Sequence, residues 1–384
     1  MATMLGVLGG GQLGNYFILA AKKMGYRTAV LDPDPHAPAG VHADKHIVAQ
    51  YENVQALTEL ASICSAVTIE FENPPVSSLE FLAQFVEVHP SPSCVAVAQN
   101  RRDEKRFLES IALSVAPYEV LETPEDAERL SRLGVARRHL QPLGTPLLMK
   151  TSRLGYDGKG QQKISELTDI SALWQNVNNV PCVVEQVVPL DAEFSVVLAR
   201  SRNGEVKVFT PTLNVHLDGI LDFSTATTAT TSIDVQFFHD GERAAIRIAE
   251  ELQYVGVLSV EFFISGDKLF VNELAPRPHN SGHWTLDAAT TSQFEQQVRT
   301  LVGLPLGDTA MTHDAVAMVN LLGDLWSEKE PHFHVAEEDT SAHLHLYGKT
   351  EARPRRKMGH ITVTGTDALS VTRHAIELRT AITG

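Results

Sequence analysis

The sequence predicts an α/β protein of two or three domains that begins with a parallel β-sheet. Its 384 residues are more than one typical hydrophobic core holds. "MLGVLGGGQLG" predicts a short strand, a glycine turn and a helix from about Gln12 to Met24, and "RTAVLD" predicts a second strand that ends at Asp32. "AVTIEFEN", from Ala66 to Asn73, predicts a third strand. Strands that alternate with helices form parallel sheets joined by crossover helices.

Composition narrows the class of protein and its partners. Hydrophobic residues make up 43% and charged residues 21%, as in soluble globular proteins, and no apolar run reaches the roughly 18 residues that span a membrane. The start, "MATMLGVLGG", lacks the basic region of a signal peptide. Cys64, Cys94 and Cys182 lie far apart, which argues against disulfides and a zinc site and favours the reducing cytoplasm. The net charge of −15 argues against nucleic-acid and membrane partners, so a site for small anions must gather its positive charge locally.

The first glycine turn allows three interpretations. Gly9, Gly11 and Gly14 fit G-x-G-x-x-G, and Asp32 follows at a distance that suits a dinucleotide site. The motif is weak by itself, because glycines at a strand–helix turn also accommodate other anions or simply allow close packing. The sequence therefore leaves open an NAD site, a different anion site and a tight structural turn.

A lysine and a glycine-rich loop follow each other in the middle of the chain. The strand "TPLLMK" ends at Lys150, and "GYDGKGQ" runs from Gly155 to Gln161. Glycines let the backbone approach a ligand and offer N–H groups to an anion, so this loop predicts a flap over phosphates, unlike a Walker A loop. A surface lysine and a plain hairpin turn are the structural alternatives.

The next two strands carry further candidates for nucleotide binding. "PCVVEQVV" ends around Glu185 and Gln186, where backbone groups would meet an adenine edge. "EFSVVLAR" opens with Glu193, whose carboxylate would accept ribose hydroxyls. An interior strand and a charge at a strand end are the ordinary alternatives.

Two acidic residues in "VLSVEFFISGDKLFVNEL" give the strongest physical signal. If the loop has three residues, Gly266 to Lys268, then Glu261 lies opposite Glu273 on one face of a strand pair. A two-residue loop would place the two carboxylates on opposite faces. Facing carboxylates require a cation, and their hard oxygens suit a Mg²⁺ ion that bridges nucleotide phosphates, with Asn272 as a further oxygen donor.

Polar residues follow this pair in "NELAPRPHNSGHWT". Arg277, His279 and Asn280 form a set of hydrogen-bond donors near the predicted metal, where a small anion would lie in line for phosphorylation. The alternative is a structured loop in which His279 and His283 cap backbone groups.

A second cluster of positive charge lies near the C-terminus, in "YGKTEARPRRKMGH". We predict that Lys349 and Arg356 point into a cleft to bind phosphate and that Arg355 points away. A solvated edge and a nucleic-acid patch are the alternatives.

These motifs together resemble one enzyme family. "GYDGKGQ", "VNELAPRPHNSGHWT", "SQFEQ" and "YGK…RPRRKMGHI" resemble the N5-carboxyaminoimidazole ribonucleotide synthetases of the ATP-grasp superfamily, over nearly the whole chain. The resemblance implies a Rossmann-like domain without NAD at residues 1–104, an ATP-grasp domain at 105–303 with a lid at about 117–186, and a small β-rich domain at 304–384. One departure is the threonine-rich tract "DFSTATTATTSIDVQ", where the family leads us to expect a loop that contains proline.

The resemblance also implies the reaction. The family carboxylates 5-aminoimidazole ribonucleotide with ATP and bicarbonate, through carboxyphosphate, in purine biosynthesis. It implies Mg²⁺, or Mn²⁺ in its place, as cofactor, and a cytoplasmic homodimer. Three alternatives stay open: an NAD-dependent oxidoreductase, a catalytically silent nucleotide-binding protein and a formate-using ribonucleotide transferase.

The site residues carried over from the family fall into four groups. The ATP-binding positions are Arg101, Lys150, Gly155, Tyr156, Asp157, Gly158, Lys159, Gly160, Gln161, Glu185, Gln186, Val187, Val188, Glu193, His216, Asn272 and Glu273. The metal ligands are Glu261 and Glu273, and the bicarbonate site is Arg277, His279 and Asn280. The ribonucleotide is held by Gln12, Tyr156, Lys349, Arg353 and Arg356. Asp157 and Lys349 also count among the catalytic candidates, with Asp157 placed to orient or deprotonate the amine.

Overall fold

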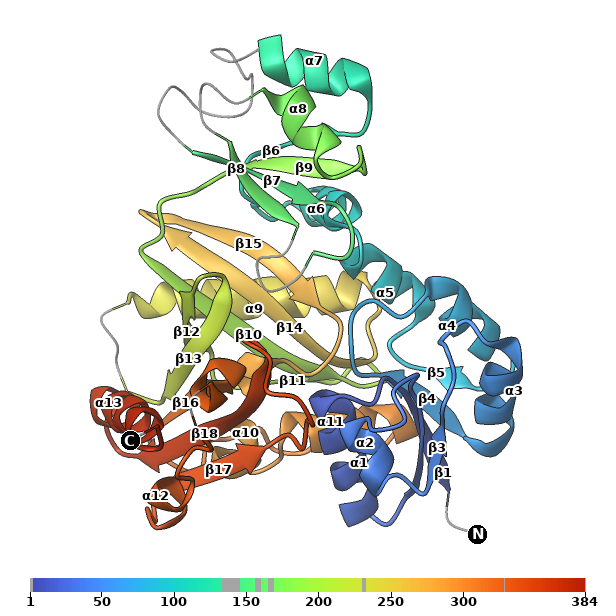
Figure 1. The fold of residues 1–384 in the computed structure, drawn as a ribbon, viewed down its shortest axis with the longest axis vertical. Coiled ribbons are helices and arrows are strands. Elements are labelled where there is room, and N and C mark those ends of the chain that lie inside the picture. The colour runs from blue at the N-terminus through green and yellow to red at the C-terminus, as the bar shows by residue number, and fades with distance from the viewer. Residues whose placement is uncertain are drawn as a thin grey trace.

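Three β-sheets organise the chain. The computed structural model describes residues 3–132, 146–155, 160–164, 169–229, 233–327 and 329–383. Figure 1 shows a parallel sheet near the N-terminus, a large central sheet and a small sheet at the far end of the molecule. Within those ranges, every helix is too short or too polar to cross a membrane.

The N-terminal domain is a parallel five-stranded sheet in the order β3-β2-β1-β4-β5, which confirms the predicted α/β start. Its strands are β1 (Met4–Leu8), β2 (Arg27–Leu31), β3 (Lys45–Ile47), β4 (Ala66–Ile69) and β5 (Glu87–Val88). Its helices are α1 (Gln12–Lys23), α2 (Pro38–His42), α3 (Val54–Ile63), α4 (Val76–Leu82) and α5 (Pro92–Ala98). The strand order reverses between β1 and β4, and open α/β sheets bind ligands in a crevice at the carboxyl ends of such strands. We call this position, bordered by the loops after β1 and β4, the N-terminal crevice.

The third strand is shorter than predicted. β4 ends at Ile69, so Glu70 and Glu72 lie beyond the sheet, in the loop that borders this crevice. Both residues contact groups that the sequence placed in candidate sites.

The turn between β1 and α1 requires glycine for close packing. A Cβ atom on Gly14 would lie 2.5 Å from the main-chain oxygen of Gly9. We expect Gly14→Ala to lower the free energy of unfolding by about 1–3 kcal/mol, because backbone atoms must move to make room. Urea unfolding measures this change. Leu19→Ala, at a 40% exposed position of the same helix, is the matched control and is expected to stay within about 0.5 kcal/mol; equal effects in the two variants would contradict this account.

The central sheet has nine strands and is shared by the central and C-terminal regions. The order is β15-β14-β10-β12-β13-β16-β18-β17, and β11 pairs with β10. The strands are β10 (Ala192–Arg200), β11 (Val206–Val208), β12 (Thr212–Leu217), β13 (Ile220–Thr227), β14 (Gly256–Ser265), β15 (Lys268–Ala275), β16 (Ala315–Leu322), β17 (Ala342–Leu346) and β18 (Lys357–Gly365). Because β13 pairs with β16, the predicted boundary at 303/304 falls within one continuous sheet, and it stays a prediction.

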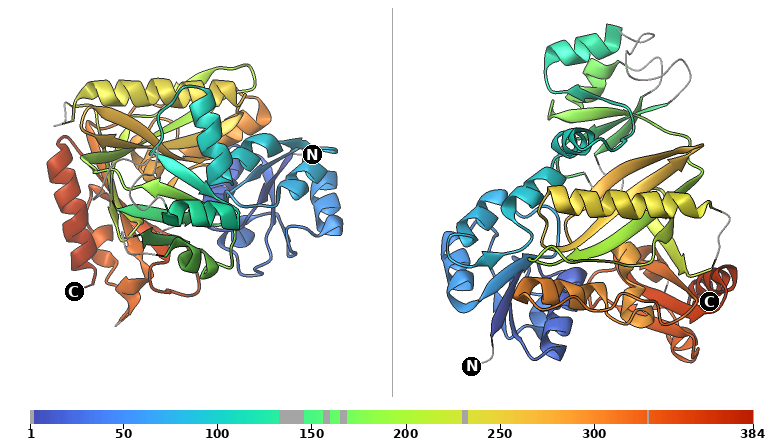
Figure 2. Two further views of the ribbon diagram at one scale, coloured as in Figure 1. Left: turned by 90° about the horizontal axis from the view of Figure 1, so that it is seen from above. Right: turned by 180° about the vertical axis from the view of Figure 1, so that it is seen from behind.

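Helices cover the faces of this sheet. Figure 2 shows α9 (Val235–Glu251) lying along β10 and β14, where Ile248 packs in the same core as Phe194 and Phe262. α11 (Gln293–Val302) packs between the central sheet and α1, and α13 (Ala368–Ala381) covers β16 and β18. The short elements are α10 (Thr285–Ala288), α12 (His334–Glu337), η1 (Asn280–Gly282) and η2 (Gly323–Trp326). The described part of the threonine-rich tract includes most of β13 and the N-terminal cap of α9. Thr225 forms a side-chain hydrogen bond with Thr372, and Asp234 accepts one from the N–H of Gln236, and neither partner is a candidate site residue.

The third sheet lies within the segment predicted as the lid, residues 117–186, and the lid assignment stays a prediction. Its order is β6-β9-β7-β8, with β6 (Tyr118–Leu121), β7 (Leu147–Thr151), β8 (Gln161–Ile164) and β9 (Cys182–Gln186). The helices α7 (Pro124–Arg132) and α8 (Ile170–Gln175) pack on it around Leu130 and Trp174, at the top of Figure 1. α6 (Arg101–Ser110) leads from the N-terminal domain to this sheet.

The structure confirms that Glu261 lies opposite Glu273, but the predicted loop was wrong. The turn has only two residues, so Ser265 pairs with Lys268. A β-bulge at Glu261 then adds one residue to β15: Phe262 pairs with Val271, whereas Glu261 pairs with Glu273. The extra residue, Asn272, restores the register that a two-residue turn alone would lose.

Candidate active site

Two carboxylates face each other where Glu261, in the middle of β14, pairs with Glu273, near the end of β15. Burial, followed by the charge of Glu273, raises the pKa of Glu261 to about 7. Asn272 Nδ2 donates to Glu261 Oε2 at 3.2 Å, and Arg101 Nη1 lies 3.4 Å from Glu273 Oε2. A carboxyl group that is buried beside a second carboxylate keeps its proton more readily. A divalent cation can replace that proton and bind both groups.

A third acidic side chain lies just behind this pair. Glu104 on α6 is buried and accepts a hydrogen bond from the main-chain N–H of Leu274 at 2.6 Å. Burial, followed by the charge of Glu273, raises the pKa of Glu104 to about 8. Sequence patterns did not identify Glu104, because a glutamate in "RRDEKRF" is typical of an exposed helix.

The predicted phosphate lysine belongs to a buried ion triad. Lys150 Nζ lies 2.7 Å from Glu185 Oε2, and Lys105 Nζ lies 3.1 Å from Glu185 Oε1. Burial alone would raise the pKa of Glu185, but Lys150 and Lys105 together lower it to about 2. The structure therefore joins two predicted ATP residues, Lys150 and Glu185, and adds Lys105, which the sequence analysis missed.

Three further predicted ATP residues lie on other elements: Arg101 on α6, Glu193 on β10 and His216 on β12. Arg101 Nη2 donates to the carbonyl of Gly155 at 3.3 Å, so the start of the glycine-rich loop is fixed to α6. His216 Nδ1 lies 2.6 Å from Glu193 Oε2. Burial lowers the pKa of His216, but the hydrogen bond and charge of Glu193, together with the charge of Glu261, outweigh burial and raise it overall.

Main-chain groups after β9 are partly used within the protein. The N–H of Gln186 donates to Pro117 O at 2.8 Å, and the N–H of Val187 donates to Pro146 O at 3.0 Å. Val188 is buried beside them. Contacts of this segment with adenine stay a prediction.

Tyr156, Asp157, Gly158 and Lys159 lie outside the described residues, so their roles in the flap stay predictions. Gly160 and Gln161 follow them, and Gly160 has a φ of +74°, which favours glycine. The carbonyl of Gly160 accepts the N–H of Thr151 at 3.0 Å, so the loop leaves β7 and returns beside it.

Among the donors predicted for bicarbonate, His279 lies beside Glu261. His279 Nε2 lies 3.4 Å from Glu261 Oε1. Burial and the charge of Arg277 hold the pKa of His279 well below its usual range, so this imidazole is neutral. Arg277 Nε donates to Glu72 Oε2 at 2.6 Å, and Asn280 is buried. Glu72 could have been predicted as a site residue, because it follows a strand beside the crevice. The predicted strand was too long and included Glu72, so the sequence analysis missed it.

The first glycine turn already holds a carboxylate of the protein itself. Glu70 accepts hydrogen bonds from the N–H groups of Gly11 at 2.6 Å and Gly14 at 2.8 Å. Asp32 accepts the N–H of Gly10 at 2.7 Å and the hydroxyl of Tyr51 at 2.8 Å. The groups that would bind a pyrophosphate and a ribose in a dinucleotide site are thus used internally, which contradicts the NAD interpretation.

Lys349 lies near this turn. Burial raises the pKa of Glu70, and the charge of Lys349 is one of the influences that oppose the rise. Lys349 Nζ donates to Lys357 O at 2.7 Å. Gln12, the first residue of α1, is half-buried at the same turn. Lys349 and Gln12 are therefore both close to the N-terminal crevice.

The arginines of the C-terminal cluster are arranged differently from Lys349. Arg353 is exposed and pairs with Glu351 at 2.7 Å, and Arg356 Nη1 donates to the carbonyl of Glu351 at 3.0 Å. Arg355 is exposed and donates to Asp218 O at 2.8 Å, and its outward orientation stays a prediction. Among the described residues, the side chains of Arg353 and Arg356 form hydrogen bonds with Glu351 of their own loop, so the structure does not join them to the other ribonucleotide candidates.

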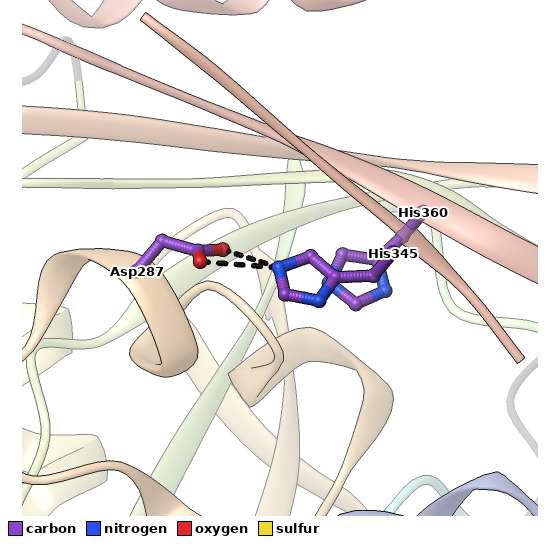
Figure 3. Close-up of side chains that lie close together, drawn as sticks. All are labelled: Asp287, His345 and His360. Carbon is purple, nitrogen blue, oxygen red and sulfur yellow. Dashed lines mark hydrogen bonds and ion pairs between the residues drawn. The ribbon is translucent and has the colours of Figure 1, made fainter. Parts of the chain in front are cut away.

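Asp287, His345 and His360 form a separate cluster, shown in Figure 3. Asp287 Oδ2 lies 2.9 Å from His345 Nε2, and the rings of His345 and His360 stack at 4.5 Å with 12° between their planes. Ligand nitrogens bind a metal within the plane of their ring, so two nearly parallel stacked rings do not direct their lone pairs to one ion. The cluster instead joins α10 to β17 and β18 by packing and hydrogen bonds.

Comparison with known proteins agrees with this geometry. Family models match as the ribonucleotide synthetase preATP-grasp domain at residues 1–99, the ATP-grasp domain at 106–294 and the phosphoribosylaminoimidazole carboxylase C-terminal domain at 316–374. The N5-carboxyaminoimidazole ribonucleotide synthase of Brucella melitensis is 42% identical over 94% of this chain and 96% of its own length. The chain belongs to the N5-carboxyaminoimidazole ribonucleotide synthase family.

Other members support the same assignment. The synthase of Bacillus subtilis is 39% identical over 94% of this chain and 91% of that protein. The structure of the synthetase from Thermus thermophilus superposes with a TM-score of 0.87, is 36% identical and covers 99% of this chain and 98% of that one. A synthase from Aspergillus clavatus, solved with ADP and 5-aminoimidazole ribonucleotide, has a TM-score of 0.86 and is 26% identical, over 99% of this chain and 98% of its own. The predicted fold, a Rossmann-like domain followed by an ATP-grasp domain and a C-terminal domain, is confirmed.

Proposed function

We propose that the protein is a carbon–nitrogen ligase that carboxylates 5-aminoimidazole ribonucleotide to N5-carboxyaminoimidazole ribonucleotide, with ATP and bicarbonate, in purine biosynthesis. Membership of the synthase family supports the reaction. The observation within this chain that carries the proposal is the pairing of Glu261 with Glu273 beside Arg277, His279 and Asn280. This arrangement supports the proposal of a phosphate-bound cation next to a small anion.

The acidic pair fits Mg²⁺, or Mn²⁺ in its place, as the cofactor. Glu261 and Glu273 offer hard carboxylate oxygens. Burial and the charge of Glu273 raise the pKa of Glu261, and a divalent cation at this position would stabilise its ionised form. When bound, the ion would neutralise the phosphate oxygens of ATP. We propose that the two glutamates hold it together with the nucleotide.

The surrounding residues would bind and orient the nucleotide. Lys150 and Arg101 supply positive charge for the phosphates, and Glu193 accepts hydrogen bonds from the ribose hydroxyls. The remaining ATP contacts that we propose are Gly155, Tyr156, Asp157, Gly158, Lys159, Gly160, Gln161, Glu185, Gln186, Val187, Val188, His216 and Asn272. Closing of the flap would exclude water, which otherwise hydrolyses a reactive acyl phosphate.

The chemistry would take place in two transfers. A bicarbonate oxygen, held by Arg277, His279 and Asn280, attacks the γ-phosphorus of ATP, so that carboxyphosphate forms and ADP leaves. The exocyclic amine of the ribonucleotide then takes the carboxyl group, and phosphate leaves. Asp157 or the departing phosphate accepts the proton of the amine. Because His279 is neutral, it would orient the anion through hydrogen bonds and leave the charge to Arg277.

The ribonucleotide would lie between the first glycine turn and the C-terminal cluster. We propose Gln12, Tyr156, Lys349, Arg353 and Arg356 as its contacts. The position of Lys349 near Glu70 supports this location, since a cation in this acidic protein attracts a phosphate. We further propose a cytoplasmic homodimer. The three cysteines are free and buried, which suits a reducing compartment, and the dimer is proposed from the family resemblance alone.

Release of ADP by the purified protein tests the proposed function. ADP release is expected only when 5-aminoimidazole ribonucleotide and bicarbonate are both present with Mg²⁺ and ATP. Formate in place of bicarbonate is expected to give no turnover, which separates this reaction from that of a formate-using transferase. Turnover at full rate without bicarbonate, or with formate in its place, would contradict the proposal.

A further inference from the structure

A buried asparagine on β16 connects the proposed bicarbonate site to the central sheet. Asn320 is fully buried, directly opposite His360 of β18. Its Nδ2 donates to the main-chain carbonyl of Leu221 and to Asn280 Oδ1, both at 2.7 Å. The two protons of this amide are therefore both used.

The backbone fixes which way both amides face. A main-chain carbonyl only accepts hydrogen bonds, so Leu221 O requires Nδ2 of Asn320 on its side. The same Nδ2 then meets Asn280, and it requires Oδ1 of Asn280 as its acceptor. The orientation of the Asn280 side chain thus follows, through Asn320, from a carbonyl group in the backbone of β13.

Because Oδ1 of Asn280 accepts the hydrogen bond from Asn320, Nδ2 of Asn280 does not bond to Asn320. Asn280 Nδ2 is buried and has no hydrogen-bond acceptor among the described residues. A buried N–H group without an acceptor is unfavourable, and such groups are rare in proteins unless a ligand or water completes them. Asn280 follows His279, whose Nε2 lies 3.4 Å from Glu261, so the donor belongs to the region proposed for the anion.

We propose that Asn320 is a positioning residue for the carboxylation reaction. It holds the side-chain amide of Asn280 so that Nδ2, and not Oδ1, faces the bicarbonate oxygen. The inference rests on the proposed function for the identity of the anion. Asn320 itself does not touch the substrate, and it acts only through the orientation of Asn280.

Exchanging the donor of Asn320 for an acceptor tests this role. In Asn320→Asp the shape is kept, but the carboxyl group carries at most one proton, which it donates in a hydrogen bond to Leu221 O. The oxygen that faces Asn280 then accepts, so the Asn280 amide rotates and presents Oδ1 to the anion. We expect the KM for bicarbonate in ADP release to rise about 10- to 100-fold, with the KM for ATP changed less than about threefold.

Asn320→Leu provides a second variant of similar size. It removes the donor without adding an acceptor, so the Asn280 amide is free to adopt both orientations, and the KM for bicarbonate is expected to rise less than in Asn320→Asp. Thr362→Val is the matched control, since Thr362 is fully buried on the neighbouring strand β18 and is not a candidate site residue. A purely structural role predicts similar losses of kcat and of thermal stability for all three variants, with no selective change for bicarbonate.

Asn280→Ala separates this inference from the proposed site. If Asn280→Ala raises the KM for bicarbonate and both Asn320 variants leave it unchanged, the positioning role is wrong and the anion site stands. If Asn280→Ala leaves this KM unchanged in an otherwise active enzyme, the assignment of Asn280 to bicarbonate is wrong, and the role of Asn320 falls with it. The inference is supported if the KM for bicarbonate rises most in Asn320→Asp, less in Asn320→Leu and not at all in Thr362→Val.

Discussion

Glu273→Gln is expected to abolish bicarbonate-dependent ADP release while the protein stays folded. The substitution keeps the shape of the side chain and removes one of the two facing charges that we propose to bind Mg²⁺. Loss of charge stabilisation at a phosphoryl-transfer site lowers kcat on the order of 10²–10³-fold or more. Measurement of ADP release over a range of Mg²⁺ concentrations gives this value, because a weakened metal site also shifts the Mg²⁺ requirement upward.

Thermal unfolding distinguishes loss of chemistry from loss of structure in this variant. Glu273 raises the pKa of Glu261, so the two groups repel each other in the absence of a cation. Removal of one charge should therefore leave the melting temperature unchanged or increase it. Glu250→Gln, at an exposed position of α9, is the control and should retain full activity. A variant Glu273→Gln that keeps normal turnover and normal Mg²⁺ dependence would contradict the proposed metal site.

For the carboxylate pair, the sequence predicted the pairing of the two residues but not the backbone geometry that produces it. The alternation of apolar and acidic residues around Gly266-Asp267 was enough to predict two strands with Glu261 opposite Glu273. The bulge at Asn272 was not predictable, because a bulge depends on how β15 packs against its neighbours and has no strong local signal. The prediction reached the right pairing through the wrong turn length.

Residues that depend on contacts between distant segments were the ones missed. Glu70 and Glu72 meet Gly11 and Arg277, which are far from them in sequence, and Lys105 on α6 meets Glu185 on β9. Strand and turn patterns report local structure, whereas these ion pairs depend on which loops meet at the edge of a sheet. Asn320 was hidden for a related reason, since one polar residue in an apolar strand gives no indication of its partner.

Glu185→Gln is expected to cause the largest loss of stability among single substitutions at the candidate site. Glu185 is buried between Lys105 and Lys150, with ammonium nitrogens 3.1 Å and 2.7 Å from its two oxygens. The amide leaves two buried ammonium groups without an anion, and breaking a buried ion pair in this way costs about 3–5 kcal/mol of unfolding free energy. Urea unfolding at pH 7, followed by the fluorescence of Trp174 in the core of the same lid, measures the loss.

The effect of pH separates this ion triad from a change in packing. The two lysines lower the pKa of Glu185 in the folded protein to about 2 from an ordinary value of 4.5. A lowered pKa means that the stabilisation is fully present above about pH 4.5 and is lost as the pH falls toward 2. The difference in unfolding free energy between the protein and Glu185→Gln should therefore be constant near neutral pH and shrink below pH 4.5.

A neighbouring ion pair in the same sheet provides the control for this experiment. Glu119 on β6 lies directly opposite Val184 of β9 and pairs with Arg129, whose side chain is 41% exposed. Exposed pairs contribute little, so Glu119→Gln should change the free energy of unfolding by about 1 kcal/mol or less. If Glu119→Gln and Glu185→Gln destabilise the lid equally, or if the loss in Glu185→Gln does not depend on pH, then burial of the carboxyl group does not account for its effect. A selective, pH-dependent loss at Glu185 would instead show that the lysine proposed to bind ATP phosphates is held in place by a charge that the folded lid keeps ionised.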